Sequence, residues 1–149
     1  MTLRLDYARA SPGGYRALVA MHRAVAESGL DPALVRMVYL RVSQINGCAY
    51  CVDLHWRDAV AAGVPPRKLN ALAPWADSGF FTPPECAALA WAESLTRLPD
   101  GGVPDAVFAA TQAAFGEKGT ADLAYAVALM GAFNRLGVGF RQPPSPEPT

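Results

Sequence analysis

Two cysteines and a histidine have the types and spacing that best fit chemistry. Cys48 and Cys51 form a C-x-x-C motif, and His55 follows four residues after the second cysteine. Residues three and four positions apart lie on one face of a helix, so both thiols and the imidazole are expected along one ridge. The N–H groups and the dipole at a helix N-terminus favour the thiolate, which is the nucleophilic form of cysteine. A neighbouring imidazole can take up or return a proton near neutral pH.

Two thiols and one base are sufficient to reduce a peroxide. One thiolate attacks the peroxide and becomes a sulfenic acid, the second condenses with it to a disulfide, and an external reductant restores both thiols. Spacing alone leaves two other interpretations open. C-x-x-C also occurs in zinc sites, but here the fourth ligand would have to be Cys86 or His22. Cysteines on an apolar helix face are often inert core residues.

Helical spacing of apolar residues dominates the chain, and strand-type alternation is not found over a useful length. The pairs Ser11-Pro12, Asp31-Pro32 and Thr82-Pro83 are typical helix starts, with a capping residue followed by proline at the first helical position. Asn46 is expected to cap the helix that carries the cysteines. Helices are expected at residues 12–28, 32–45, 48–62, 66–75, 83–98, 105–115 and about 120–136.

The composition indicates one globular domain in a reducing compartment. The chain has 149 residues, 13 basic and 13 acidic side chains and three cysteines. A net charge of zero gives no electrostatic footprint for nucleic acid or for an anionic membrane, and no apolar run is long enough to span a bilayer. The first residues lack an apolar signal core. We therefore expect a cytoplasmic protein, where stable structural disulfides are uncommon.

The chain divides into a domain at residues 1–141 and a proline-rich tail at residues 142–149. Four of the eight tail residues are proline, so the tail is expected to be an extended or disordered arm rather than a helix. The slight apolar excess of the whole chain, 52% hydrophobic residues, is a hint that copies associate.

The stretch Leu40–His55 resembles the core motif of the AhpD-like alkylhydroperoxidase and carboxymuconolactone decarboxylase superfamily. The resemblance covers nearly the whole chain short of the tail and continues through Trp75, Phe80–Pro83, Ala92–Thr96 and Phe133–Arg141. It implies an all-α, AhpD-like fold of about six to eight helices. It also implies a homo-oligomer, either a trimer or a hexamer.

The resemblance also assigns roles to the motif. In the resembling peroxidases the second cysteine meets the peroxide and the first resolves, which makes Cys51 peroxidatic and Cys48 resolving. Position alone would favour Cys48, nearer the helix N-terminus, as the more acidic thiol. His55 falls on the histidine of the family's proton relay.

Two positions depart from the family relay. The relay Glu usually stands twelve residues before the first cysteine, where this chain has Arg36, and a His sometimes found between the cysteines is Tyr50 here. Arg36 cannot accept a proton, although a guanidinium can stabilise a thiolate. Glu93 and Glu27 are candidates to supply a carboxylate from other helices.

These observations predict a thiol-dependent peroxidase that reduces hydrogen or alkyl hydroperoxides. Its electron donor is an unidentified dithiol or protein, and no metal or cofactor is expected. Two alternatives stay open. One is lactone chemistry like that of carboxymuconolactone decarboxylase, a branch that does not need the cysteine pair. The other is a non-enzymatic oligomer whose disulfide senses redox state, which Arg36 in the relay position leaves open.

Overall fold

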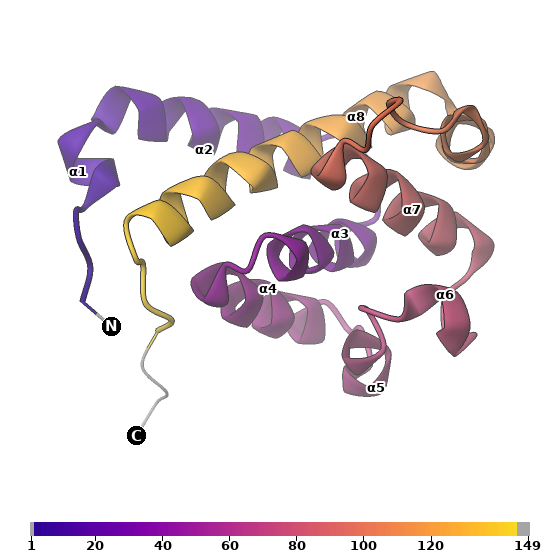
Figure 1. Cartoon of the computed structure of the whole chain (residues 1–149), viewed down its shortest axis with the longest axis horizontal. Helices are drawn as coiled ribbons and strands as arrows, with labels where there is room; N and C mark the ends of the chain where they lie inside the picture. The colour runs from indigo at the N-terminus through magenta and orange to yellow at the C-terminus, as the bar shows by residue number, and fades with distance from the viewer. Residues whose placement is uncertain (1, 146–149) are drawn as a thin grey trace.

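The computed structural model describes residues 2–145, which form α-helices joined by loops (Figure 1). In chain order the helices are α1 (Tyr7–Ala10), α2 (Pro12–Ala26), α3 (Pro32–Ile45), α4 (Ala49–Ala61), α5 (Pro66–Asn70), α6 (Trp75–Ser78), α7 (Pro83–Arg97) and α8 (Asp105–Gly139). No strand occurs between residues 2 and 145. The predicted all-α fold is confirmed.

Local start signals set the beginnings of the long helices. Pro32 is the first residue of α3, and the Asp31 carboxylate accepts a hydrogen bond at 2.9 Å from a backbone N–H in the first turn. Thr82 precedes α7, and its N–H donates to the Glu85 carboxylate at 2.7 Å. Such caps satisfy polar groups that have no partner within the helix. These boundaries therefore follow from a few adjacent residues.

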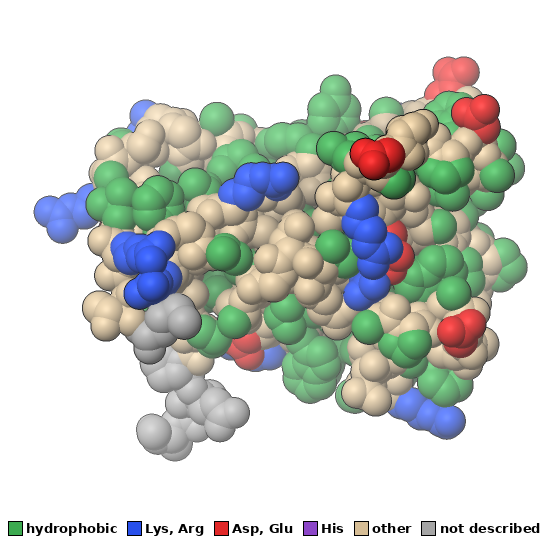
Figure 2. Space-filling view, in the orientation of Figure 1, with side chains coloured by type: hydrophobic (Ala, Val, Ile, Leu, Met, Phe, Trp, Pro, Cys, Tyr) green, Lys and Arg blue, Asp and Glu red, His purple; other side chains and the backbone are tan. Residues whose placement is uncertain are grey.

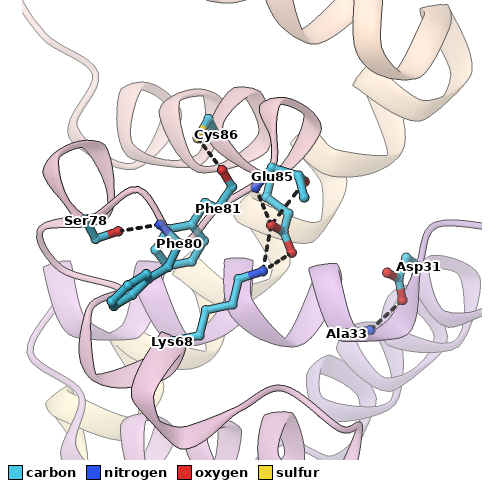
Figure 3. A network of polar contacts seen from close by, with 9 residues as sticks. Asp31, Ala33, Lys68, Ser78, Phe80, Phe81, Glu85 and Cys86 are labelled. Carbon is cyan, nitrogen blue, oxygen red and sulfur yellow. Dashed lines mark hydrogen bonds and ion pairs between the residues drawn. The ribbon is translucent and has the colours of Figure 1, made fainter.

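The Glu85 carboxylate also ties the short α5 to α7. Lys68 donates to its two oxygens at 2.6 and 2.7 Å, and Figure 3 shows the lysine side chain reaching that carboxylate. Burial alone would raise the pKa of Glu85, but the hydrogen bonds from Lys68 and Thr82 lower it below its ordinary value. The charge-assisted contact anchors the segment between the two helices.

Helix α3 lies at the centre of the fold. It contacts α4, α7 and α8, and Figure 1 shows it between α4 and the α7–α8 pair. The side chains of Val38, Leu40 and Val42 are 0% exposed. Removing such apolar side chains from water is the main favourable term in folding. Because α3 packs against several helices at once, its side chains contact both α4 and α7.

Several element boundaries differ from the prediction. Helix α1 was not predicted. Asn46 ends α3 instead of capping the next helix, and Cys48 occupies the capping position of α4. Trp75 begins α6, whereas a helix ending there was expected. The reason is Pro74, which has no N–H to donate and disfavours helical backbone at the residue before it.

The C-terminal region agrees with the two helices that were predicted there, because α8 consists of two helical segments joined across a kink. Within α8, Gly116 has φ 67° and ψ −179°, so the axis changes direction there. A residue with a side chain would be strained at this positive φ, whereas glycine is not. The first segment therefore ends next to Phe115, as predicted, and the second continues to Gly139, a few residues past its predicted end.

The remaining predictions concern the C-terminal tail, membrane spans and association between copies of the chain. Residues 142–145 carry no secondary structure, and the rest of the predicted tail lies outside the described residues. No helix within residues 2–145 combines the length and apolar character that a membrane span requires. Charged side chains are scattered over the face in Figure 2 among exposed apolar ones. The expected homo-oligomer stays a prediction.

Candidate active site

The C-x-x-C motif lies at the turn between α3 and α4. Gly47 has a φ of +66°, which lets the chain reverse after α3. The Cys48 N–H then donates to the Ser43 carbonyl at 3.1 Å. Cys48 caps α4, and its Sγ accepts a hydrogen bond from the Cys51 N–H at 3.3 Å. The two sulfurs are joined as a disulfide, with the Cα atoms 5.3 Å apart.

Helix α8 holds this turn through an amide side chain. Asn134 donates to the Ser43 hydroxyl at 3.0 Å and accepts from the Asn46 amide at 2.9 Å. Asn134 is 1% exposed. Because buried polar groups are costly unless they are paired, this contact favours one arrangement of α8 on the turn.

A cavity of about 310 Å³ opens beside the disulfide. Aromatic and apolar side chains form most of its wall, with a few ionisable groups among them. The lining residues are Tyr7, Tyr15, Val19, His22, Arg36, Tyr50, Cys51, Leu54, His55, Asp58, Met130 and Phe133. Cys51 is therefore the cysteine of the pair that reaches the cavity, while Cys48 is not among the lining residues. A mostly apolar cavity with a few convergent polar groups is typical of a small-molecule site.

His55 is positioned one helical turn after Cys51 and also lines the cavity. The histidine is 6% exposed. Burial lowers its pKa from 6.5 to about 4, while the Asp58 carboxylate opposes the shift and the positive charge of Arg36 adds to it. The imidazole is therefore neutral at neutral pH and has a nitrogen free to accept a proton.

A carboxylate that the sequence analysis missed lies next to this histidine. Asp58 Oδ2 is 3.7 Å from His55 Nδ1 and 3.6 Å from Arg36 Nη1. The three side chains all line the cavity and form a cluster of ionisable groups. Asp58 follows His55 by three residues, so the i, i+3 spacing on α4 was a signal that could have identified it.

Tyr39 lies against the same histidine from α3. The two ring centroids are 5.1 Å apart, and the Tyr39 hydroxyl has no hydrogen-bond partner among the described residues. Burial raises the pKa of Tyr39 to about 12. The side chain therefore stays a neutral phenol and gives His55 an apolar wall.

Of the supporting residues named from the sequence, the structure brings Arg36 and Tyr50 to the cavity, and His22 lies there as well. Glu93 is not among the lining residues. It accepts hydrogen bonds from Arg41 at 2.7 Å, Trp75 at 3.1 Å and Arg97 at 2.6 Å.

These contacts account for the ionisation of Glu93. Burial alone would raise its pKa, but the hydrogen bonds from Arg41 and Arg97 lower it below its ordinary value. Glu93 thus holds α3 against α7, and the carboxylate that lies beside His55 is Asp58.

The geometry of the cysteine pair can be compared with the zinc-site and inert-core interpretations of the C-x-x-C motif. Both sulfurs of the pair are engaged in the disulfide, and within residues 2–145 no three His, Cys, Asp or Glu side chains gather into a metal site. Cys86 is a free thiol on α7, with its Sγ 3.7 Å from the Phe81 carbonyl oxygen. The geometry favours redox chemistry at the pair, and the role of each residue stays a prediction.

Comparison with known proteins places the chain in a family. Residues 12–94, more than half of the chain, match the Carboxymuconolactone decarboxylase family. The chain is 29% identical over 138 residues to the uncharacterized protein YdfG of Bacillus subtilis. The aligned region covers 93% of this chain and 94% of YdfG.

Solved structures show the same fold. A protein of unknown function from Agrobacterium tumefaciens is 33% identical, with a TM-score of 0.93 over 98% of this chain and all of that one. An uncharacterized peroxidase-related protein with an AhpD core, from Ralstonia eutropha, is 24% identical, with a TM-score of 0.82 over 94% of this chain and 75% of that one. The chain belongs to the carboxymuconolactone decarboxylase family and has the AhpD-like fold.

Proposed function

We propose that this protein is a thiol-dependent peroxidase that reduces hydrogen or alkyl hydroperoxides through Cys51 and Cys48, with His55 as the proton carrier. The observation that carries the proposal is the placement of one sulfur. Cys51 opens into a cavity that His55 also lines, while Cys48 lies behind it and is joined to it as a disulfide. A nucleophile, a base and a resolving thiol are therefore together at a space that admits a small molecule.

The first half of the reaction takes place at Cys51. Its thiolate attacks the outer oxygen of the hydroperoxide, the O–O bond breaks, and Cys51 becomes a sulfenic acid. The alkoxide or hydroxide that leaves takes a proton from His55 and departs as an alcohol or water. Cys48 then attacks the Cys51 sulfur, an S–S bond forms, and the sulfenic oxygen leaves as water with the proton of the Cys48 thiol.

The second half restores the thiols with an external dithiol. The donor reaches the Cys51 sulfur from the cavity and forms a mixed disulfide, and Cys48 leaves as a thiolate. The Cys51 N–H, 3.3 Å from the Cys48 sulfur, and the N-terminus of α4 stabilise that thiolate. The second donor thiol then releases Cys51. The net reaction converts one hydroperoxide and one dithiol into an alcohol, water and a disulfide.

The cluster of ionisable groups, Arg36, His55 and Asp58, gives His55 its role in this cycle. With the disulfide closed, the pKa of His55 is about 4 because the ring is buried. Reduction places a thiolate one helical turn away, and that negative charge favours the imidazolium. Asp58, whose Oδ2 is 3.7 Å from His55 Nδ1, adds to this effect. His55 therefore gains a proton when Cys51 becomes a thiolate and gives it up when the leaving oxygen needs it.

The names of similar proteins support the same activity. The Agrobacterium protein carries a name that proposes an AhpD role in antioxidant defence, and the Ralstonia protein is described as peroxidase-related. We further expect a cytoplasmic homo-oligomer with a dithiol or a protein dithiol as its donor.

The test is peroxide consumption in the presence of a dithiol. The wild type should consume hydrogen peroxide or an alkyl hydroperoxide above a control without protein. Cys51→Ser should abolish turnover. Cys48→Ser, tested without a dithiol, should consume one peroxide per chain and leave a sulfenic acid on Cys51 that dimedone traps. Cys86→Ser is the matched control, because this free thiol lies outside the cavity lining. Full activity in Cys51→Ser, or none in the wild type, would contradict the proposal.

A further inference from the structure

Gly137 lies where α8 passes behind the disulfide. A methyl group built at this glycine would place its carbon 2.8 Å from the Cys48 sulfur and 3.6 Å from the Cys51 sulfur. Carbon atoms in contact are normally about 3.5–4.0 Å apart, and sulfur is larger than carbon. The glycine is buried, so the backbone of α8 forms the rear wall of the cysteine pair.

The other glycines near this end of α8 have no such neighbour. A methyl group at Gly139 would meet nothing within 4 Å, and one at Gly131 would meet only the end of the Arg135 side chain, at 3.0 Å. Glycine in a helix interior is less favourable than alanine. Helical propensity therefore gives no reason for glycine at position 137, whereas the approach of the sulfur does.

We propose that Gly137 is a positioning residue that leaves the Cys48 sulfur the space in which it bonds to Cys51. The argument rests on a difference between the two redox states. In the disulfide, the covalent bond fixes the Cys48 sulfur next to Gly137. In the dithiol, rotation about the Cα–Cβ bond of Cys48 can carry the sulfur away. A side chain at position 137 therefore opposes the disulfide more than the dithiol.

This inference has a consequence for turnover, and that consequence alone rests on the proposed peroxidase function. When Cys51 carries a sulfenic acid, the Cys48 sulfur must move into the space beside Gly137 to displace the oxygen as water. A methyl group there slows this step and leaves the first attack on the peroxide unchanged. Sulfenic acid on Cys51 then accumulates during turnover.

The direct test is the redox equilibrium of the cysteine pair, which requires no peroxide. The protein is equilibrated with mixtures of reduced and oxidised dithiothreitol, and the free thiols are then alkylated and counted. In this exchange the protein dithiol passes two electrons and two protons to the oxidised reagent and becomes a disulfide.

Gly137→Ala should shift the equilibrium about tenfold or more toward the dithiol, which corresponds to about 30 mV. Gly139→Ala is the matched control on the same helix and should change it by less than about twofold. An equal shift in the two variants, or no shift in Gly137→Ala, would overturn the proposal.

A second measurement separates positioning from a general packing defect. In the parent chain, Gly137→Ala should lower the melting temperature of the oxidised protein more than that of the reduced protein. In the Cys48→Ala background the sulfur is absent, and the same substitution should be tolerated. If Gly137→Ala destabilises the Cys48→Ala chain as strongly as the oxidised parent, the sulfur is not the reason for the glycine.

Discussion

Replacing Asp58 with asparagine tests whether the carboxylate beside His55 assists the chemistry. The substitution keeps the size of the side chain and removes its charge, while Arg36 stays in place. Asp58 Oδ2 lies 3.7 Å from His55 Nδ1, so the imidazolium that forms when Cys51 loses its proton would no longer face a negative charge. We expect a higher pKa for the Cys51 thiol and slower attack on peroxide.

The size of the effect follows from the distance and the exposure. Two unit charges at this separation interact by about 4 kcal/mol at an effective dielectric constant of about 20 and by about 1 kcal/mol in water. The Asp58 side chain is 37% exposed and also faces Arg36, so screening brings the value toward the lower end. About 1–2 kcal/mol corresponds to a loss of about 5–30-fold in kcat/KM.

The assay measures peroxide consumption and, separately, the reactivity of Cys51. In the Cys48→Ser, Cys86→Ser background Cys51 is the only thiol, and the pH dependence of its alkylation by iodoacetamide reports its pKa. Asp53→Asn is the matched control, because Asp53 lies on the same helix and pairs with Arg57 at 2.9 Å. Equal losses in the two variants, or an unchanged Cys51 pKa in Asp58→Asn, would refute the role of the carboxylate.

Three further predictions concern stability. Because burial lowers the pKa of His55 to about 4, the unfolded chain takes up a proton first as the pH falls through 6.5. Stability should therefore drop by about 2 kcal/mol between about pH 7 and about pH 5 from this residue alone, and urea unfolding of His55→Gln should lack that drop. Glu93→Gln removes the carboxylate that pairs with the buried Arg41 guanidinium. We expect the free energy of unfolding to fall by about 2 kcal/mol. The value of kcat/KM should stay unchanged, since Glu93 does not line the cavity. Asn134→Ala removes both hydrogen bonds that tie α8 to the C-x-x-C turn, and calorimetry should show a loss of about 1–2 kcal/mol; an unchanged melting temperature would mean that these bonds add nothing to stability.

Much of the fold could be predicted because its signals are local. Asp31-Pro32 and Thr82-Pro83 open α3 and α7 where the sequence indicates, since a cap and the proline after it act within one helical turn. The short α1 and the boundary at Trp75 were harder, because a helix of four residues has little intrinsic stability and depends on its surroundings.

The candidate site, like the fold, has one part that the sequence predicts and another that it does not. The sequence by itself determined that Cys48, Cys51 and His55 follow one another at helical spacing, because three and four residues apart means one face of a helix. Asp58 obeys the same rule and could have been read from it.

Only the tertiary structure decided which sulfur faces the cavity, that Glu93 does not line it, and which residue lies behind the cysteine pair. Arg41 on α3 holds Glu93 away from the site, Tyr39 covers His55, and Gly137 approaches the Cys48 sulfur from the far end of the chain. These contacts join residues on different helices that are not neighbours in the sequence. No local pattern encodes them, because they arise when buried apolar faces bring the helices together.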